Sequence, residues 1–182
     1  MNKSIFHSAA LLTVLLCVTF LVLLPAHVFA TDFFVNDNST VGDVFTASVG
    51  NDSNSGTSGN PFRTISHALS VANAGDTIFI DAGLFSEAVV IDKDFVSFIG
   101  VDSRTTLIDP PGSQGTVGVN GISAQTRVGL SIKNVGVIDA NVAIRFDDVD
   151  FSRITGIRNT TCDDGFLLFN CIQPVEVTGT LV

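Results

Sequence analysis

Short apolar segments rich in β-branched residues recur along the chain after Asp76 and limit the folds that it can form. After Asp76 come TIFI from Thr77, AVVI from Ala88, FVSFIG from Phe95 and TLID from Thr106, separated mainly by Gly, Asp and other turn-forming residues. Parallel strands of an ordinary βαβ sheet need a helical crossover of a dozen or more residues, and these spacings leave no room for one. We therefore expect an all-β coil of stacked short strands.

A weak internal repeat supports this stacking. The segment DANVAIRFDDV, which begins at Asp139, resembles the later segment CDDGFLLFNCI, which begins at Cys162. A period of about 20 to 30 residues is typical of a solenoid, in which each coil buries its apolar side against its neighbours. The alignment and its continuation stack Ala143 with Phe166, Ile144 with Leu167, and Ile154 with Val177.

One helix is predicted in this chain, over residues 62–74. Its apolar residues recur at helical spacing, at Phe62, Ile65, Leu69 and Ala72. Pro61 suits the opening turn of a helix and Gly75 its C-terminal exit. We expect the helix to cap the first coil, with Ile65 and Leu69 buried against Ile78 and Ile80, because the open end of a solenoid exposes unpaired strand edges.

The rest of the chain from residue 31 onward divides around this helix. Residues 31–61 are rich in Asn, Asp, Ser and Gly and predict an extended and loop segment, with short strands at 33–35 and 44–46. Residues 75–182 predict the coils of a right-handed parallel β-helix. The chain stops directly after the apparent strand VEVTGTLV, so we expect the coils to be truncated at the C-terminus.

The segment 50–109 carries a family resemblance. Its sequence GNDSNSGTSGNPFRTISHALSVANAGDTIFIDAGLFSEAVVIDKDFVSFIGVDSRTTLID resembles the N-terminal cap and first coils of pectin-lyase-like right-handed parallel β-helix proteins. The resemblance implies a loop that leads through Pro61 and Phe62 into the capping helix. It implies little about chemistry, because that superfamily includes polysaccharide lyases, hydrolases, adhesins and many surface proteins.

Residues 1–30 predict an export signal. Lys3 supplies the positive end, an almost wholly apolar run extends from Ala9 to Leu24, and Val28-Phe29-Ala30 suits a cleavage site after Ala30. An uncleaved membrane anchor is the alternative, since the run approaches the length of a bilayer span. We expect a secreted or cell-surface protein that meets the membrane only through this signal segment.

The charge of the mature chain limits its partners. Only Lys3 of the 9 Lys and Arg residues leaves with the signal, whereas all 18 Asp and Glu residues remain, so the net charge falls from −9 to about −10. Such an acidic chain argues against a nucleic-acid partner, because neutralising phosphates needs clustered Lys and Arg. It permits cation binding, and calcium is the cofactor that we consider.

The candidate calcium ligands are acidic and amide side chains at predicted turns. Two lie in the loop before the helix and three in the later coils: Asp52, Asn54, Asp147, Asp163 and Asp164. Calcium needs six to eight oxygen ligands, and no complete set is visible. The same internal alignment places Asp163 over Ala140 and Asp164 over Asn141, and neither lies over another acidic residue. We therefore favour solvated turn residues for the Asp side chains of the later coils. For Asp52 and Asn54 we favour hydrogen bonds that fix the local turn.

Cysteine and histidine content limits the chemistry further. Cys162 and Cys171 remain after the signal is removed and are candidates for a disulfide, although their spacing does not show whether they face each other. His67 is the one histidine left, and it lies on the predicted helix, which gives no oriented general base.

Two functions follow from these observations. The first is a non-catalytic extracellular module that binds polysaccharide or builds a cell-surface structure. The second is the N-terminal part of a polysaccharide lyase or glycoside hydrolase acting on an acidic polysaccharide. The uncapped last strand also predicts end-to-end self-association, because it is β-prone and carries a single charge at Glu176.

Overall fold

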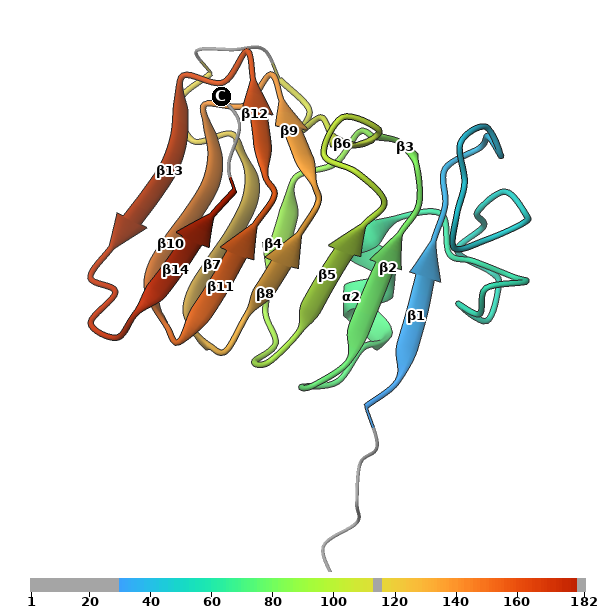
Figure 1. Cartoon of the computed structure of the whole chain (residues 1–182), viewed down its shortest axis with the longest axis horizontal. Helices are drawn as coiled ribbons and strands as arrows, with labels where there is room; N and C mark the ends of the chain where they lie inside the picture. Colours follow the sequence, from blue (N-terminus) through green and yellow to red (C-terminus); the bar gives the residue numbers. More distant parts are fainter. Residues whose placement is uncertain (1–29, 113–115, 180–182) are drawn as a thin grey trace, which may run out of the picture.

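The computed structural model describes residues 30–112 and 116–179, which form a right-handed parallel β-helix (Figure 1). Each coil contributes one short strand to each of three parallel sheets, numbered here in the order in which a coil visits them. Sheet 1 contains β1 (Asp32–Val35), β2 (Thr77–Ile80), β5 (Ser97–Gly100), β8 (Ser131–Lys133), β11 (Ser152–Thr155) and β14 (Val175–Thr178). Sheet 2 contains β3 (Gly83–Phe85), β6 (Thr106–Ile108), β9 (Gly136–Ile138) and β12 (Arg158–Thr160). Sheet 3 contains β4 (Val89–Ile91), β7 (Asn120–Val128), β10 (Val142–Asp150) and β13 (Asp164–Phe169).

The core of the helix is a set of apolar columns that run parallel to its axis. In sheet 1, Ile78, Phe98, Ile132 and Ile154 stack in register and are almost completely buried. Neighbouring strands lie about 4.8 Å apart, so each of these side chains contacts the one above and the one below. Alternate residues point outward, and burial alternates in β2 accordingly. The four predicted strand segments from Thr77 to Ile108 are confirmed as β2, β4, β5 and β6.

The register of the later coils differs by one position from the alignment predicted in the sequence. Ile144 pairs with Phe166 and Arg145 pairs with Leu167, so the predicted pairs Ala143 with Phe166 and Ile144 with Leu167 are wrong. The pair Ile154 with Val177 is confirmed, because the turn between β13 and β14 is longer by one position. A slip of one position reverses which side chains face the core, so the correction changes the predicted outer surface.

The capping helix is present but shorter than predicted. Helix α2 spans Ile65–Val71 and packs against β1, β2 and β4, with Ile65 and Leu69 buried as predicted. Thr64 is its N-cap in an extended conformation, so Pro61 lies before the helix rather than in its opening turn.

Two carboxylates fix the point at which α2 begins. Asp52 Oδ1 accepts hydrogen bonds from the backbone N–H groups of Arg63 and Thr64 at 2.8 and 3.0 Å. Glu87 accepts from the backbone N–H groups of Ile65 and Ser66, both at 2.8 Å. These acceptors satisfy donors that a helix start leaves without intrahelical partners. The residues before Ile65 are thereby held out of the helix.

The outer edge of β1 is also covered. The backbone N–H of Phe34 donates to Gly56 O, and Phe34 O accepts from the backbone N–H of Phe62, both at 2.9 Å. The loop that precedes α2 thus occupies the edge of β1 that β2 leaves free. An edge covered in this way offers few free backbone groups to another strand.

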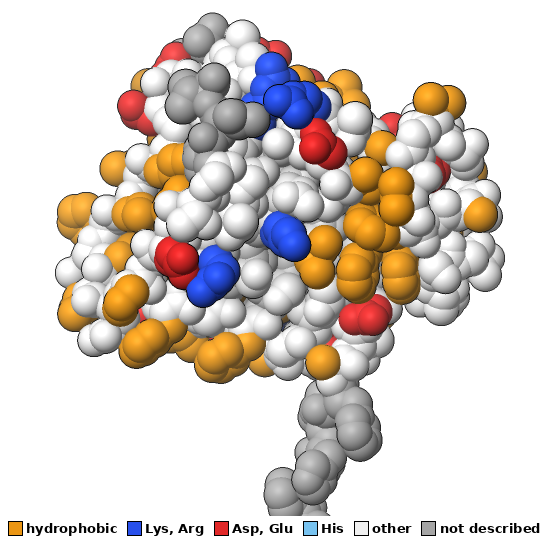
Figure 2. Space-filling model, in the orientation of Figure 1, with side chains coloured by type: hydrophobic (Ala, Val, Ile, Leu, Met, Phe, Trp, Pro, Cys, Tyr) orange, Lys and Arg blue, Asp and Glu red, His pale blue; other side chains and the backbone are white. Residues whose placement is uncertain are grey.

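The predicted strand at 44–46 is instead a loop. The backbone N–H groups of Val44, Phe45 and Thr46 converge on the buried Asp81 carboxylate at 2.7, 3.0 and 2.7 Å. Three successive N–H groups directed at one side chain cannot form a strand ladder. Phe45 also packs edge-on against Phe79, whose ring stacks on Phe34, and Figure 2 shows hydrophobic side chains gathered on this face of the molecule.

The last described coil is less buried than the others. Leu168 faces inward in the column of Phe146 and Ala124, yet it is 39% exposed, whereas Phe146 is completely buried. No described strand lies above β13, so its inward side chains meet solvent at the axial end. The end-to-end association predicted from the sequence stays a prediction.

Removing the apolar contact of the cap should destabilise the protein. Leu69→Ala should cost about 2–5 kcal/mol, because it leaves a cavity beneath α2. Val71 lies on the same helix but is 42% exposed, so Val71→Ala should change stability by less than about 0.5 kcal/mol. Chemical denaturation of both variants measures the difference. Equal stabilities for the two variants would show that α2 does not act as a cap.

A second prediction concerns a column of left-handed residues in sheet 3. Thr126 in β7, Asp148 in β10 and Asn170 directly after β13 lie one coil apart and have φ values of 55°, 55° and 53°. Asn adopts this conformation more readily than Thr, and Asn170 already donates a hydrogen bond to Asp148. Thr126→Asn should therefore stabilise the protein by about 0.5–1 kcal/mol.

The matched control for this substitution lies within a regular strand. Thr155 in β11 has no left-handed conformation to relieve, and Asn is a poor strand former, so Thr155→Asn should lower the melting temperature. Thermal unfolding compares the two variants. A decrease for Thr126→Asn as well would contradict the strain argument.

Candidate functional site

A polar hollow on the outer face of sheet 3 is the candidate site. Its cavity of about 260 Å³ crosses three neighbouring strands, and we call it the sheet-3 groove. It is lined by Val90, Asn120, Ser123, Ala124, Gln125, Arg145 and Asp147.

The alternation of the strands places these side chains together. Val90 pairs with Ser123 and Ser123 with Arg145, so these three residues form one outward column. Gln125 and Asp147 form the next outward column. The residues between them point into the core, which fixes the spacing of the outward side chains. The groove is therefore assembled from three strands, β4, β7 and β10, that lie one coil apart in the sequence.

An ion pair forms the most polar part of the groove. Arg145 Nε donates to Asp147 Oδ2 at 2.9 Å, and the two side chains are 41% and 19% exposed. Within the described residues, the terminal NH₂ groups of Arg145 form no hydrogen bond or ion pair. A guanidinium group carries five N–H donors, so Arg145 keeps donors for a ligand in the groove. The ion pair fixes the orientation of these donors.

Two acceptor atoms at the groove have no partner among the described residues. Asn120 Oδ1 and Asp147 Oδ1 are buried and accept no hydrogen bond. Buried polar atoms are nearly always paired with protein groups or ordered water. Among the described residues, Asn120 Oδ1 and Asp147 Oδ1 are exceptions to this rule.

The structure separates the candidate calcium ligands of the later coils. Asp147 lies opposite Phe169 at the end of β13, whereas Asp164 lies opposite Val142 at its start. The length of the strand between these positions places them about 16 Å apart. Asp163 accepts a hydrogen bond from Asn141 Nδ2 at 3.0 Å. The predicted stacking of Asp163 over Ala140 and of Asp164 over Asn141 is therefore wrong by one position.

The two candidates in the loop act on nearby backbone. Asp52 binds the residues that precede α2, and Asn54 Nδ2 donates to Pro61 O at 2.8 Å. Within residues 30–112 and 116–179, no group of three or more His, Cys, Asp or Glu side chains is arranged to hold a metal ion. Calcium binding by Asp52, Asn54, Asp147, Asp163 or Asp164 therefore stays a sequence prediction.

The two cysteines are free thiols rather than the disulfide considered from the sequence. Cys162 precedes β13 and Cys171 follows it. A strand of this length spans about 20 Å, and a disulfide requires Cα atoms less than about 7 Å apart. Burial raises the pKa of the Cys162 thiol, which disfavours the reactive thiolate.

Two partly buried carboxyl groups lie elsewhere in the fold. Burial raises the pKa of Asp43, the hydrogen bond from Asn36 Nδ2 opposes this shift, and the nearby Asp81 and Asp37 add to it. Burial also raises the pKa of Asp109, with a further contribution from Asp139. Neither group lines the sheet-3 groove.

The predicted export signal falls almost wholly outside the described residues. Residues 1–29 are not described, and Ala30, after which cleavage is expected, is the first residue that is. Within the described part of the chain, no helix is long and apolar enough to cross a membrane. The signal, its cleavage and the location of the protein stay predictions.

Sequence reasoning identified only one of the polar groove residues, Asp147, and assigned it to calcium. It missed Asn120, Ser123, Gln125 and Arg145, although an alternation signal is present. Ser123 and Gln125 alternate with apolar residues in NGISAQ, and Arg145 and Asp147 lie two positions apart in VAIRFDDVD. In a strand this spacing places side chains on one face.

Comparisons with known proteins bear on the N-terminal part of the chain. A family described as a protein of unknown function (DUF1565) matches residues 48–95. This range covers part of the loop, helix α2 and the first complete coil from β2 to β4. A search of curated proteins and a search of solved structures gave no match. The structure supports the parallel β-helix architecture that the resemblance implied. Membership of the pectin-lyase-like superfamily stays a prediction.

The raised pKa of Asp43 predicts a pH-dependent stability. A carboxyl whose folded pKa exceeds its unfolded value near 3.8 destabilises the fold as pH rises through the folded pKa. Asp43→Asn should therefore raise the melting temperature at pH 7, and this gain should shrink as the pH falls towards 3.8. Asp32→Asn removes the same charge from an exposed position and serves as the control. A gain for Asp43→Asn that is equal at pH 3 and pH 7 would contradict the prediction.

Proposed function

We propose that the protein is a secreted parallel β-helix module that binds polysaccharide in the sheet-3 groove without transforming it chemically. The observation that carries this proposal is the composition of the groove. It offers a hydroxyl at Ser123, an amide at Gln125, a guanidinium at Arg145 and an apolar wall at Val90. Sugars present hydroxyl groups around an apolar ring face, and this mixture of donors, acceptors and carbon matches them.

The presence of a single carboxylate among the groove residues favours binding over glycoside hydrolysis. Most glycoside hydrolases use two carboxyl groups on opposite sides of the scissile bond. Asp147 is the one carboxylate among the residues that line the groove, and Arg145 is bound to it. Such a pair can orient a ligand, whereas acid–base hydrolysis needs a second carboxyl group.

The scaffold suits a binding role because its strands hold the groove in place. Ser123, Arg145 and Val90 project from three strands that are hydrogen-bonded in register. Side chains fixed by regular structure lose little further entropy when a ligand binds. The net charge of the mature chain, about −10 with the signal removed, is also compatible with a neutral partner.

The expected location supports the same function. The export signal predicted for residues 1–30 would deliver the β-helix to the outside of the cell, where polysaccharides are abundant. The alternative function, as the N-terminal part of a lyase or hydrolase, would use residues beyond this groove.

The test is a matched pair of arginine substitutions. Arg145 and Arg153 both project outward from strands and both bind a carboxylate, but Arg153 lies on sheet 1, where it contacts Glu176 at 2.8 Å. Arg145→Gln should weaken polysaccharide binding by about tenfold or more, because hydrogen bonds from a charged donor are lost. Arg153→Gln should leave binding unchanged.

Affinity electrophoresis with xylan, mannan, β-glucan and polygalacturonate measures both variants and the unchanged protein. Melting temperatures confirm that each variant is folded. Equal retardation of the two variants in every gel, or no retardation of the unchanged protein in any, would contradict the proposal.

A further inference from the structure

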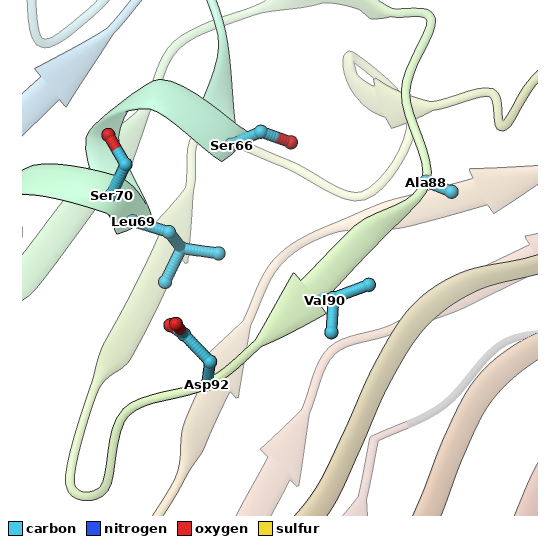
Figure 3. A pocket seen from close by; sticks show the side chains of 6 residues that line it. All are labelled: Ser66, Leu69, Ser70, Ala88, Val90 and Asp92. Atoms are coloured by element: carbon cyan, nitrogen blue, oxygen red, sulfur yellow. The ribbon is translucent and has the colours of Figure 1, made fainter.

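A second hollow lies beside the sheet-3 groove, between α2 and β4. Its cavity of about 210 Å³ is lined by Ser66, Leu69, Ser70, Ala88, Val90 and Asp92. Figure 3 shows that Leu69 projects from the helix toward the strand and that the Asp92 carboxylate is turned toward Leu69. We call this hollow the helix-side pocket.

Val90 lines both hollows. Its side chain is 62% exposed on the outer face of β4, with the helix-side pocket on one side and the sheet-3 groove on the other. β4 is the first strand of sheet 3, and α2 packs against it. The two hollows therefore adjoin at Val90, and we call the line that runs from α2 across β4 and β7 to β10 the path. From β4 to β10 this path measures about 10 Å, two strand spacings, and α2 lengthens it further.

We propose that this path binds one linear, uncharged polysaccharide chain in at least two subsites, with Val90 as the apolar contact between them. The inference rests on the proposed function and adds a class of ligand and a direction of binding. The chain runs parallel to the axis of the β-helix, because the path crosses successive strands.

The charges along the path favour an uncharged chain. Lys93 Nζ contacts Asp92 at 2.9 Å, and Arg145 contacts Asp147 at the same distance. Each cation beside the path is thus already neutralised by a carboxylate. An acidic polymer would bring its own carboxylates close to Asp92 and Asp147, and like charges at short range repel.

The hydroxyl groups of the helix-side pocket are oriented as acceptors. Ser66 Oγ donates to Glu87 Oε2 at 2.5 Å, and Ser70 Oγ donates to His67 O at 2.7 Å. With their protons engaged, both oxygens present lone pairs, and Asp92 adds carboxylate oxygens. A sugar hydroxyl can donate to such acceptors, whereas the deprotonated carboxylate of a uronic acid cannot.

The test uses calorimetric titration of the full chain with xylo-, manno- and gluco-oligosaccharides of two to six units. Oligogalacturonates of the same lengths are the acidic counterparts. For at least one neutral series, affinity should rise about tenfold or more from the disaccharide to the hexasaccharide, because the longer chain reaches the second subsite.

Substitutions on α2 locate the second subsite. Ser70→Lys should fill the helix-side pocket and reduce hexasaccharide affinity to the disaccharide level. Val71→Lys is the matched control, since Val71 is exposed on the same helix but lines neither hollow, and it should leave both affinities unchanged. Melting temperatures verify the fold of both variants.

Each other outcome overturns a defined part of the account. If disaccharides bind as tightly as hexasaccharides, or if Ser70→Lys has no effect, the elongated path is wrong and the proposed function stands. Tighter binding of oligogalacturonates would overturn the uncharged ligand. Absence of binding by every oligosaccharide would overturn both the inference and the proposed function.

Discussion

The in-register stacking of coils is the constraint on which the rest of the structure depends. Parallel hydrogen bonding between strands keeps each inward residue over another inward residue, as Ile132 over Ile154. It also sets outward residues side by side, as Ser123 beside Arg145. Differences in coil length are confined to the turns, because an insertion within a strand would reverse its faces. In sheet 1 the coil that separates β5 from β8 is much longer than the coil that separates β2 from β5, yet both pairs of strands are in register.

Stacking alone leaves an open end, and the N-terminal segment closes it with polar contacts as well as apolar ones. The side chains of Asp52 and Glu87 accept hydrogen bonds that start α2 at Ile65, and Asp81 holds the loop that precedes the helix. These carboxylates replace backbone partners that a regular strand or a longer helix would provide. The region that matches the family of unknown function, residues 48–95, includes much of this closure together with the first complete coil.

Much of this architecture could be predicted from the sequence, and the errors have physical causes. Runs such as TIFI carry their own β propensity and turn signals, so β2 was predicted within its observed bounds. The register was missed by one position because the last turns of the β-helix differ in length by one position, and a single repeat length cannot describe them all. The start of α2 was missed because Asp52 and Glu87 act from outside the helix. The groove was missed because its residues come together only once that register is known.

The groove connects the architecture to a function. Parallel stacking turns residues one coil apart into a continuous surface, and a cap helix extends that surface past β4. An extended ligand aligned with the axis meets equivalent positions on successive coils, which a single loop could not offer.

The most direct test of this account is an NMR titration of the isotope-labelled protein with the neutral hexasaccharide that binds it most tightly. The account predicts that amide shift changes concentrate at residues 66–70, 88–92, 120–125 and 145–147, which line the path. Changes confined to the outer face of sheet 1, at residues 97–99, 131–133 and 153–155, would contradict it.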